Sequence, residues 1–172
     1  MGPGPEPVPD SPDPFPINLL RRLVERGVDF VAIGGVALTA HGSARYTDDL
    51  DVCYSNDAMN LELLGTVLVE LGARLRGVDE DVPFVPDGRT LRRSGILCLD
   101  STEGPIDLLL QPAGAPPYDE LRRRAVRMDL GGFGVLVASL DDLEAMKRAA
   151  GRPIDLIDLE EIEAIRRLTE RG

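Results

Sequence analysis

Two aspartates on either side of Leu50 have the type and spacing that bind divalent cations. Asp49 and Asp51 lie at the start of an apolar run, residues 50–54, that we expect to form a strand. Because side chains along a strand alternate between its faces, both carboxylates should lie on one face, roughly 7 Å apart along the chain. Such carboxylates can bridge two magnesium ions about 3.5 to 4 Å apart, the separation used in phosphoryl transfer. The alternative is a solvated acidic strand end, which is common for any Asp-x-Asp.

Asp107 is the best candidate for a third ligand. It is the only ionisable residue in the apolar run 106–110, and a carboxylate buried there without a partner would be costly. Coordination of a metal ion would explain its position. We therefore predict that Asp49, Asp51 and Asp107 converge around a divalent cation.

A glycine pair precedes these aspartates. Gly34 and Gly35 follow an apolar run, residues 28–33, and precede a helical pattern. Without Cβ atoms, their backbone N–H groups can approach a triphosphate at a helix N-terminus. An ordinary turn between a strand and a helix would look the same.

Lys147 is the only lysine among 19 basic residues. On a helical wheel it falls within the apolar stripe of its helix and not on the charged face. A lysine that points inward needs an anion, and triphosphate or pyrophosphate oxygens would supply one. The alternative is a lysine at the edge of the stripe whose ammonium reaches water.

Three further polar residues lie near the acidic strand. Arg45 and Thr47 come just before it, where the guanidinium would bind phosphate or pair with Asp48. His41 is the only histidine; it either caps and packs beside Gly42 or helps to shape a nucleotide site.

Hydrophobic periodicity predicts the elements that position these residues. Helices are expected at residues 17–27, 36–41 and 153–168. A further helix has the apolar stripe Leu61, Leu64, Leu68 and Leu71 and is capped by Ser55 or Asn56. Another begins at Ser139 or Asp141 and ends at Ala150. The expected strands cover residues 28–33, 50–54, 96–99, 106–110, 126–130 and 133–137, the last four as two antiparallel hairpins. Residues 77–93 are expected to be a loop with one short strand.

The order of these motifs resembles the DNA polymerase beta-like nucleotidyltransferases, in particular the small bacterial AbiEii-like and minimal nucleotidyltransferases. The resemblance covers residues 28–168 and rests on these segments: Gly34-Gly35, His41-Gly42, Arg45, Thr47, Asp49-Leu50-Asp51, Ile106-Asp107-Leu108, Leu143 to Lys147 and Gly151-Arg152-Pro153. It implies an α+β nucleotidyltransferase fold, with a central mixed β-sheet flanked by helices and with C-terminal helices.

The resemblance also implies an activity: transfer of a nucleoside monophosphate from a nucleoside triphosphate to an acceptor hydroxyl or phosphate, with release of pyrophosphate. Asp49, Asp51 and Asp107 would hold two Mg²⁺ ions, with Mn²⁺ as an alternative, and Asp107 would help to deprotonate the acceptor. Gly34 and Gly35 would contact the nucleotide phosphates. The acceptor would be a small cationic molecule, a tRNA end or a protein side chain.

One position departs from the family pattern. Relatives often carry a lysine where this chain has Ile154, just before Asp155. Phosphate binding therefore shifts to Lys147 and to Arg152. Asp155 would orient one of these two cations or favour the first turn of the last helix.

Composition limits the class of protein. The 172 residues fit a single domain, which we place at residues 17–172 behind a disordered Pro-rich tail, residues 1–16. A net charge of −11 disfavours long nucleic acids as partners but suits a nucleotide that carries magnesium. Cys53 and Cys98 are expected as buried, reduced thiols. No segment resembles a signal peptide or a membrane span, so we expect a cytoplasmic protein without membrane contact.

A second function keeps the fold without catalysis: a silent nucleotide-binding module, or one half of a toxin–antitoxin pair with a cognate antitoxin. Three acids in one cleft argue against it, because their repulsion is tolerable only with cations present. One dense basic cluster would bind RNA or mark a solvated helix end. It comprises Arg122, Arg123, Arg124 and Arg127.

Overall fold

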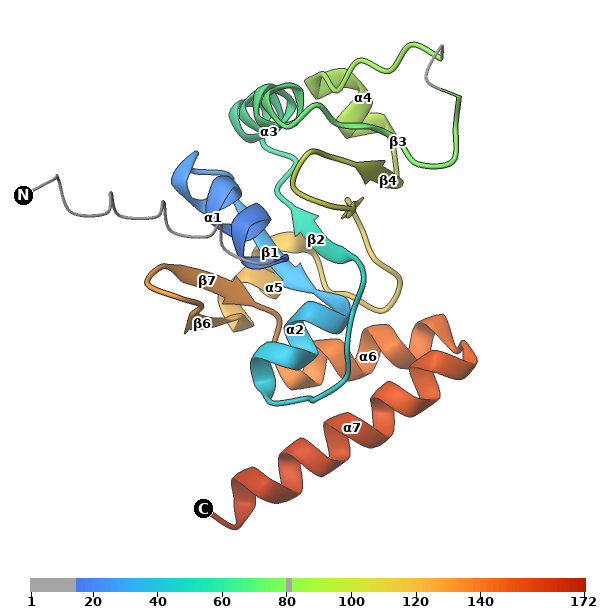
Figure 1. Cartoon of the computed structure of the whole chain (residues 1–172). Coiled ribbons are helices and arrows are strands. Elements are labelled where there is room, and N and C mark those ends of the chain that lie inside the picture. Colours follow the sequence, from blue (N-terminus) through green and yellow to red (C-terminus); the bar gives the residue numbers. More distant parts are fainter. Residues whose placement is uncertain (1–14, 80–81) are drawn as a thin grey trace, which may run out of the picture.

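A mixed β-sheet forms the centre of the protein. The computed structural model describes residues 15–79 and 82–172, and within them seven strands pair in the order β3-β4-β5-β2-β1-β7-β6 (Figure 1). The strands are β1 (Phe30–Ile33), β2 (Leu50–Tyr54), β3 (Arg74–Leu75), β4 (Ile96–Asp100), β5 (Ile106–Leu109), β6 (Val126–Asp129) and β7 (Gly134–Val137). The helices are α1 (Ile17–Glu25), α2 (Gly34–His41), α3 (Ala58–Glu70), α4 (Gly88–Arg93), α5 (Tyr118–Arg124), α6 (Leu140–Ala150) and α7 (Pro153–Glu170). The α+β class, with C-terminal helices, is therefore confirmed.

The middle strands are buried on both faces. All four residues of β1 are buried, although successive side chains point to opposite sides of the sheet. Strand β2 lies between β1, to which it is antiparallel, and β5, to which it is parallel. This arrangement explains why the central segments are almost wholly apolar in sequence, and why a carboxylate within them is conspicuous.

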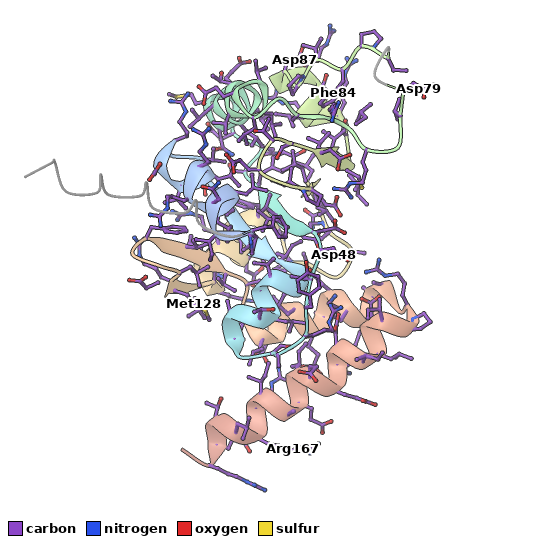
Figure 2. All side chains as sticks on the ribbon, in the orientation of Figure 1. Asp48, Asp79, Phe84, Asp87, Met128 and Arg167 are labelled. Carbon is purple, nitrogen blue, oxygen red and sulfur yellow. The ribbon has the colours of Figure 1, made fainter. Side chains whose placement is uncertain are left out.

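Two groups of helices lie at opposite ends of the molecule. Figure 1 shows α3 and α4 at one end and the packed pair α6 and α7 at the other. The last turns of α7, which carry Arg167, project from the body (Figure 2). No helix in the described residues has the length and apolar character needed to cross a bilayer.

The predicted N-terminal tail ends earlier than residue 16. Residues 1–14 lie outside the described part of the chain, but Phe15 packs against the core. A Cβ atom on Gly104 would come within 2.6 Å of the Phe15 ring. The carbonyl of Pro16 accepts a hydrogen bond from the Leu20 N–H at 3.0 Å, so it begins α1. The tail prediction is wrong for Phe15 and Pro16, because the many prolines hid one aromatic anchor.

The segment predicted as a loop contains a helix. Residues 88–93 form α4, whose N-cap Asp87 accepts a hydrogen bond from the Thr90 N–H at 2.8 Å. Only Leu91 of this helix is a buried large side chain, and its carbonyl accepts a hydrogen bond from the Tyr54 hydroxyl at 2.7 Å. A six-residue helix with one apolar anchor has no visible periodicity, so sequence patterning missed it.

Two smaller expectations are corrected by the structure. Asp57, and neither Ser55 nor Asn56, caps α3, because its carboxylate accepts a hydrogen bond from the Met59 N–H. Cys53 is buried, but Cys98 is exposed. Strand β4 alternates between buried and exposed positions, so an apolar run did not imply burial on both faces.

Candidate active site

Asp51 and Asp107 are direct neighbours on parallel strands. In the register of β2 with β5, Asp51 pairs with Asp107, and paired residues of neighbouring strands project to the same face. The two carboxyl groups are close enough to hydrogen-bond when one is protonated. The sequence prediction that these two acids converge is therefore matched by the geometry.

Burial and the neighbouring carboxylate make Asp51 hard to ionise. Burial, then the charge and hydrogen bonding of Asp107, then the charge of Asp49 raise the pKa of Asp51 to about 7, and the charge of Lys147 acts in the opposite direction. Oδ1 of Asp107 is buried and lies 3.0 Å from Nη1 of Arg76. A divalent cation is the ligand that such a pair of acceptors favours.

Arg76 is the residue that sequence reasoning missed. Its Nη1 lies 3.0 Å from Oδ1 of Asp107 and 3.9 Å from Oδ1 of Asp49. Its Nε lies 3.2 Å from Oδ1 of Asp100, and its Nη2 donates a hydrogen bond to the Leu99 carbonyl at 2.8 Å. Arg76 follows a two-residue strand in a charged segment, and no pattern there indicates a functional residue.

Asp49 lies outside the strand and is drawn toward this arginine. It precedes β2, which begins at Leu50, and 46% of its side chain is exposed. As the side chains stand, no group of three or more His, Cys, Asp or Glu residues within 15–79 and 82–172 is arranged to hold a metal ion. The placement of both acids of the Asp-x-Asp on one strand is corrected, because Asp49 belongs to the preceding bend.

The glycine pair opens α2. The helix begins at Gly34 and not at Val36, and its N-cap Ile33 offers no side-chain hydrogen bond. The N–H groups of a first helical turn have no partner within the helix and carry partial positive charge, which favours anions. Gly34 has a φ of +67°, and a Cβ atom there would overlap Oδ2 of Asp51 and stand 3.0 Å from its carboxylate carbon. The first residue of α2 and the carboxylate of Asp51 are therefore in direct contact.

Gly35 is required for a different contact. A Cβ atom on Gly35 would lie 2.8 Å from Oγ1 of Thr47 and 3.3 Å from Nη2 of Arg45. The Thr47 hydroxyl donates a hydrogen bond to the Asp49 carbonyl at 3.2 Å. Thr47 thus packs over the glycine turn and holds the backbone from which the acidic segment begins.

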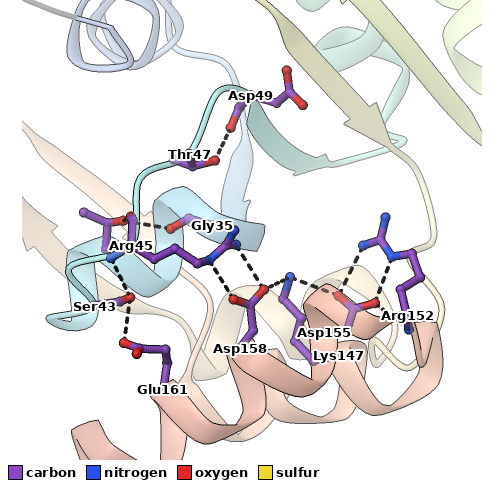
Figure 3. A network of polar contacts seen from close by, with 11 residues as sticks. Gly35, Ser43, Arg45, Thr47, Asp49, Lys147, Arg152, Asp155, Asp158 and Glu161 are labelled. Atoms are coloured by element: carbon purple, nitrogen blue, oxygen red, sulfur yellow. Dashed lines mark hydrogen bonds and ion pairs between the residues drawn. The ribbon is translucent and has the colours of Figure 1, made fainter.

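Lys147 finds its anion within the protein. Its ammonium lies 2.8 Å from Oδ2 of Asp158 and 3.3 Å from Oδ1 of Asp155, and both aspartates are completely buried (Figure 3). Nε of Arg152 lies 2.8 Å from Oδ2 of Asp155, and Nε of Arg45 lies 2.7 Å from Oδ1 of Asp158. Three cations share two carboxylates, so this network retains one net positive charge.

The same network shows which group Arg45 pairs with and what Asp155 does, two questions that the sequence left open. Arg45 pairs with Asp158 and not with Asp48, which is exposed (Figure 2). Burial acts to raise the pKa of Asp155, but hydrogen bonds from the side chain and the N–H of Arg152, together with the charge of Lys147, lower it to about 2. Asp155 therefore orients both cations and caps α7 as well.

A cleft of about 260 Å³ joins these groups. Its polar lining consists of Asp51 and Gly34 from β2 and α2 and of Lys147, Arg152 and Asp155 from α6 and the start of α7. The remaining wall is apolar and is formed by Ile33, Ile96, Leu109, Pro112, Ala113, Leu143, Met146 and Ala150. An acidic corner, a helix start and a cationic network around an apolar wall can bind a metal-bound phosphate with an attached base.

His41 and two arginines of the basic cluster contact other groups of the protein. Nε2 of His41 lies 2.8 Å from the Ala138 carbonyl. In the basic cluster, Nε of Arg122 lies 3.1 Å from Asp29 and Nη1 of Arg124 lies 2.9 Å from Asp142. These arginines belong to the last turn of α5, and their charges are in part neutralised by these acids.

The chain is similar to known proteins in its three-dimensional structure and not in its sequence. No protein-family model matches the chain, and no curated protein sequence matches it. The structure of ANT(2")-Ia in complex with adenylyl-2"-tobramycin is 17% identical, with a TM-score of 0.51 over 90% of this chain and 86% of that one. An antigenic nucleotidyltransferase-like protein from Paracoccidioides brasiliensis is 18% identical, with a TM-score of 0.51 over 88% of this chain and 73% of that one. The chain therefore has the nucleotidyltransferase fold.

Proposed function

We propose that this protein is a metal-dependent nucleotidyltransferase, which moves a nucleoside monophosphate from a nucleoside triphosphate to an acceptor hydroxyl or phosphate and releases pyrophosphate. The observation that carries the proposal is the position of Asp51, which lies against Gly34 at the start of α2 and pairs with Asp107 in the strand register. One point then offers carboxylates for a cation and backbone N–H groups for a phosphate. The sequence resemblance to AbiEii-like and minimal nucleotidyltransferases supports the same assignment.

Asp51 and Asp107 fit a divalent cation, Mg²⁺ or Mn²⁺. The two acids pair in the strand register, and burial together with the charge of Asp107 raises the pKa of Asp51 to about 7. When bound, the cation would neutralise the phosphate charge and polarise the α-phosphate. Asp49, on the adjoining bend, is the further candidate ligand.

The chain's own groups would bind and orient the nucleotide. The N–H groups at Gly34 and Gly35 would receive phosphate oxygens at the positive end of α2. Lys147 would face the phosphates across the cleft as part of a network with one net positive charge. Arg45 and Thr47 would act by positioning, since Arg45 holds Asp158 and Thr47 packs over Gly35. Asp107 would accept the proton of the acceptor hydroxyl.

A small cationic acceptor suits the chain better than RNA. The formal net charge is −11, which repels polyanions and attracts cations. The arginines at the end of α5 pair with Asp29 and Asp142, so they offer a weak polyanion site. The likeness to a structure that contains adenylyl-2"-tobramycin makes an amino sugar the first acceptor to test, before tRNA ends and protein side chains.

A silent nucleotide-binding module, such as a toxin–antitoxin partner, is the second candidate. It is favoured by one observation: Asp49 and Asp107 already face Arg76, and no three-acid metal group is formed within residues 15–79 and 82–172. In that case the cleft would bind a nucleotide without transferring it.

Labelling distinguishes the two candidates. The purified chain is incubated with Mg²⁺, each α-³²P-labelled nucleoside triphosphate and, separately, aminoglycosides, total tRNA or proteins of a cell extract. Transfer of label to one class, lost in Asp51→Asn and Asp107→Asn but retained in the surface variant Glu70→Gln, supports the enzyme. Nucleotide binding without any transfer would establish the silent module.

A further inference from the structure

Arg76 places a permanent positive charge inside the proposed metal site. Its guanidinium contacts Asp107 and Asp49, which are two of the three acids predicted to hold two divalent ions. Asp51 is not among its ion-pair partners. The arginine therefore contacts the cluster at Asp107 and Asp49, and it forms no ion pair with Asp51, which lines the cleft together with Gly34.

The guanidinium is anchored by groups outside the cluster. Nη2 of Arg76 donates to the Leu99 carbonyl at 2.8 Å and Nε donates to Oδ1 of Asp100 at 3.2 Å. The Arg76 N–H also donates to the Cys98 carbonyl at 2.9 Å. The two contacts of the guanidinium to β4 would remain if Asp49 or Asp107 turned toward a metal ion, so a bound cation would not release the side chain.

A second divalent ion would meet this fixed charge. An ion that used Asp49 and Asp107 would have to stand beside Nη1 of Arg76, which lies 3.0 Å from Oδ1 of Asp107. Like charges at such separations repel strongly in a partly buried site. An ion held by Asp51 and Asp107 would gain both carboxylates, and only one of them, Asp107, is paired with the guanidinium.

We infer that Arg76 takes the place of one of the two divalent ions, so that the chain binds a single ion at Asp51 and Asp107 beside a permanent guanidinium charge. This inference rests on the proposed function and specifies its metal site. It also explains why Asp49 faces an arginine although the sequence places it in an Asp-x-Asp motif.

Titration with Mn²⁺ tests the count of ions without any turnover. The full chain is titrated with MnCl₂ in the absence of nucleotide, and free Mn²⁺ is followed by electron paramagnetic resonance. We expect one ion per wild-type chain, and none in Asp51→Asn. Arg76→Met should bind two ions, the first at least tenfold more tightly than the wild type does, because a like charge has been removed. Two Mn²⁺ ions about 4 Å apart would also show magnetic coupling.

Two variants control for charge and for folding. Arg76→Lys keeps a positive charge and should still bind one ion. Arg26→Met removes a surface arginine that pairs with Glu70 and should behave as the wild type. If Arg76→Met is unfolded by circular dichroism, the counts in the wild type and in Arg76→Lys still decide the matter.

The outcomes separate this inference from the proposed function. Two ions in the wild type, no ion in the wild type, or one ion with unchanged affinity in a folded Arg76→Met variant would overturn the role of Arg76. One ion in the wild type and two in Arg76→Met would support it, even if no nucleotide were ever transferred. Transfer activity in a chain that binds two ions would leave the function standing without the inference.

Discussion

The backbone of Gly34 lies so close to Asp51 that a Cβ atom on the glycine would overlap Oδ2 of the aspartate. Gly34 also has a φ of +67°, a conformation that favours glycine. The contact joins the start of α2 to the strand that carries the acid. Both residues line the same cleft.

Gly34→Ala should therefore lower both stability and nucleotide transfer. The strained backbone alone costs about 1 to 3 kcal/mol, and the added methyl group would push the Asp51 carboxylate out of place. Urea denaturation and transfer of labelled nucleotide measure the two effects. Gly95→Ala is the control, because a Cβ atom there meets nothing within 4 Å. Equal activity of the two variants would contradict the role of Gly34.

Asp51→Asn should abolish transfer and yet change the pH dependence of metal-free stability. Burial and the charge of Asp107 raise the pKa of Asp51 from 3.8 to about 7. Between these values the folded chain holds a proton that the unfolded chain releases, so wild-type stability should fall as pH rises from about 4 to about 7. Denaturation in EDTA at pH 5 and pH 8 should show this fall in the wild type and a smaller one in the variant.

Mg²⁺ should stabilise the wild-type chain. A ligand that binds the folded state at a hundred times its dissociation constant adds about 2.7 kcal/mol, and the ion also relieves the repulsion between Asp51 and Asp107. Thermal unfolding with 10 mM MgCl₂ and with EDTA measures the shift. Asp51→Asn and Asp107→Asn should lose it and Glu70→Gln should keep it; an equal shift in all four proteins would rule out a site at this pair.

Lys147→Met should be strongly destabilising. The ammonium lies 2.8 Å from Asp158 and 3.3 Å from Asp155, both completely buried, and removing one partner of a buried ion pair costs about 3 to 5 kcal/mol. Arg148→Met changes the neighbouring residue, whose side chain is 68% exposed, and should have little effect. The double variant Lys147→Met/Asp158→Asn should recover part of the loss, because one uncompensated charge is gone. Additive losses in urea denaturation would argue against the network.

Acid should weaken the junction of α6 and α7. Hydrogen bonds from Arg152 outweigh the effect of burial and lower the pKa of Asp155 from 3.8 to about 2. A carboxyl whose pKa is lowered on folding contributes stability above its unfolded value, and this contribution is lost as pH falls from about 4 through about 2. Asp155→Asn should be less stable at pH 6 and should show a flatter acid limb in a denaturation series from pH 6 to pH 2.

Local patterns in the sequence were sufficient for most of the framework. The strand at residues 50–54 is found at those bounds, and both hairpins and both C-terminal helices are present. Periodicity succeeds for the central strands and for α6 because their apolar residues are buried in the core. It failed for α4, where one leucine anchors six residues, and for Phe15, which a proline-rich composition concealed.

For the site, the sequence by itself identified Asp51 and Asp107 as candidates, together with Asp49, which lies outside the strand. Asp51 and Asp107 stand at matching positions of two apolar strands, and strand pairing brings such positions together. Only the tertiary structure shows which acids the cations Arg76 and Lys147 pair with. Arg76, which follows β3, reaches Asp107 on β5 across β4, and Lys147 meets Asp158 only because α7 packs against α6. Ion pairs of this kind depend on where long side chains end in space, and hydrophobic periodicity carries no information about that.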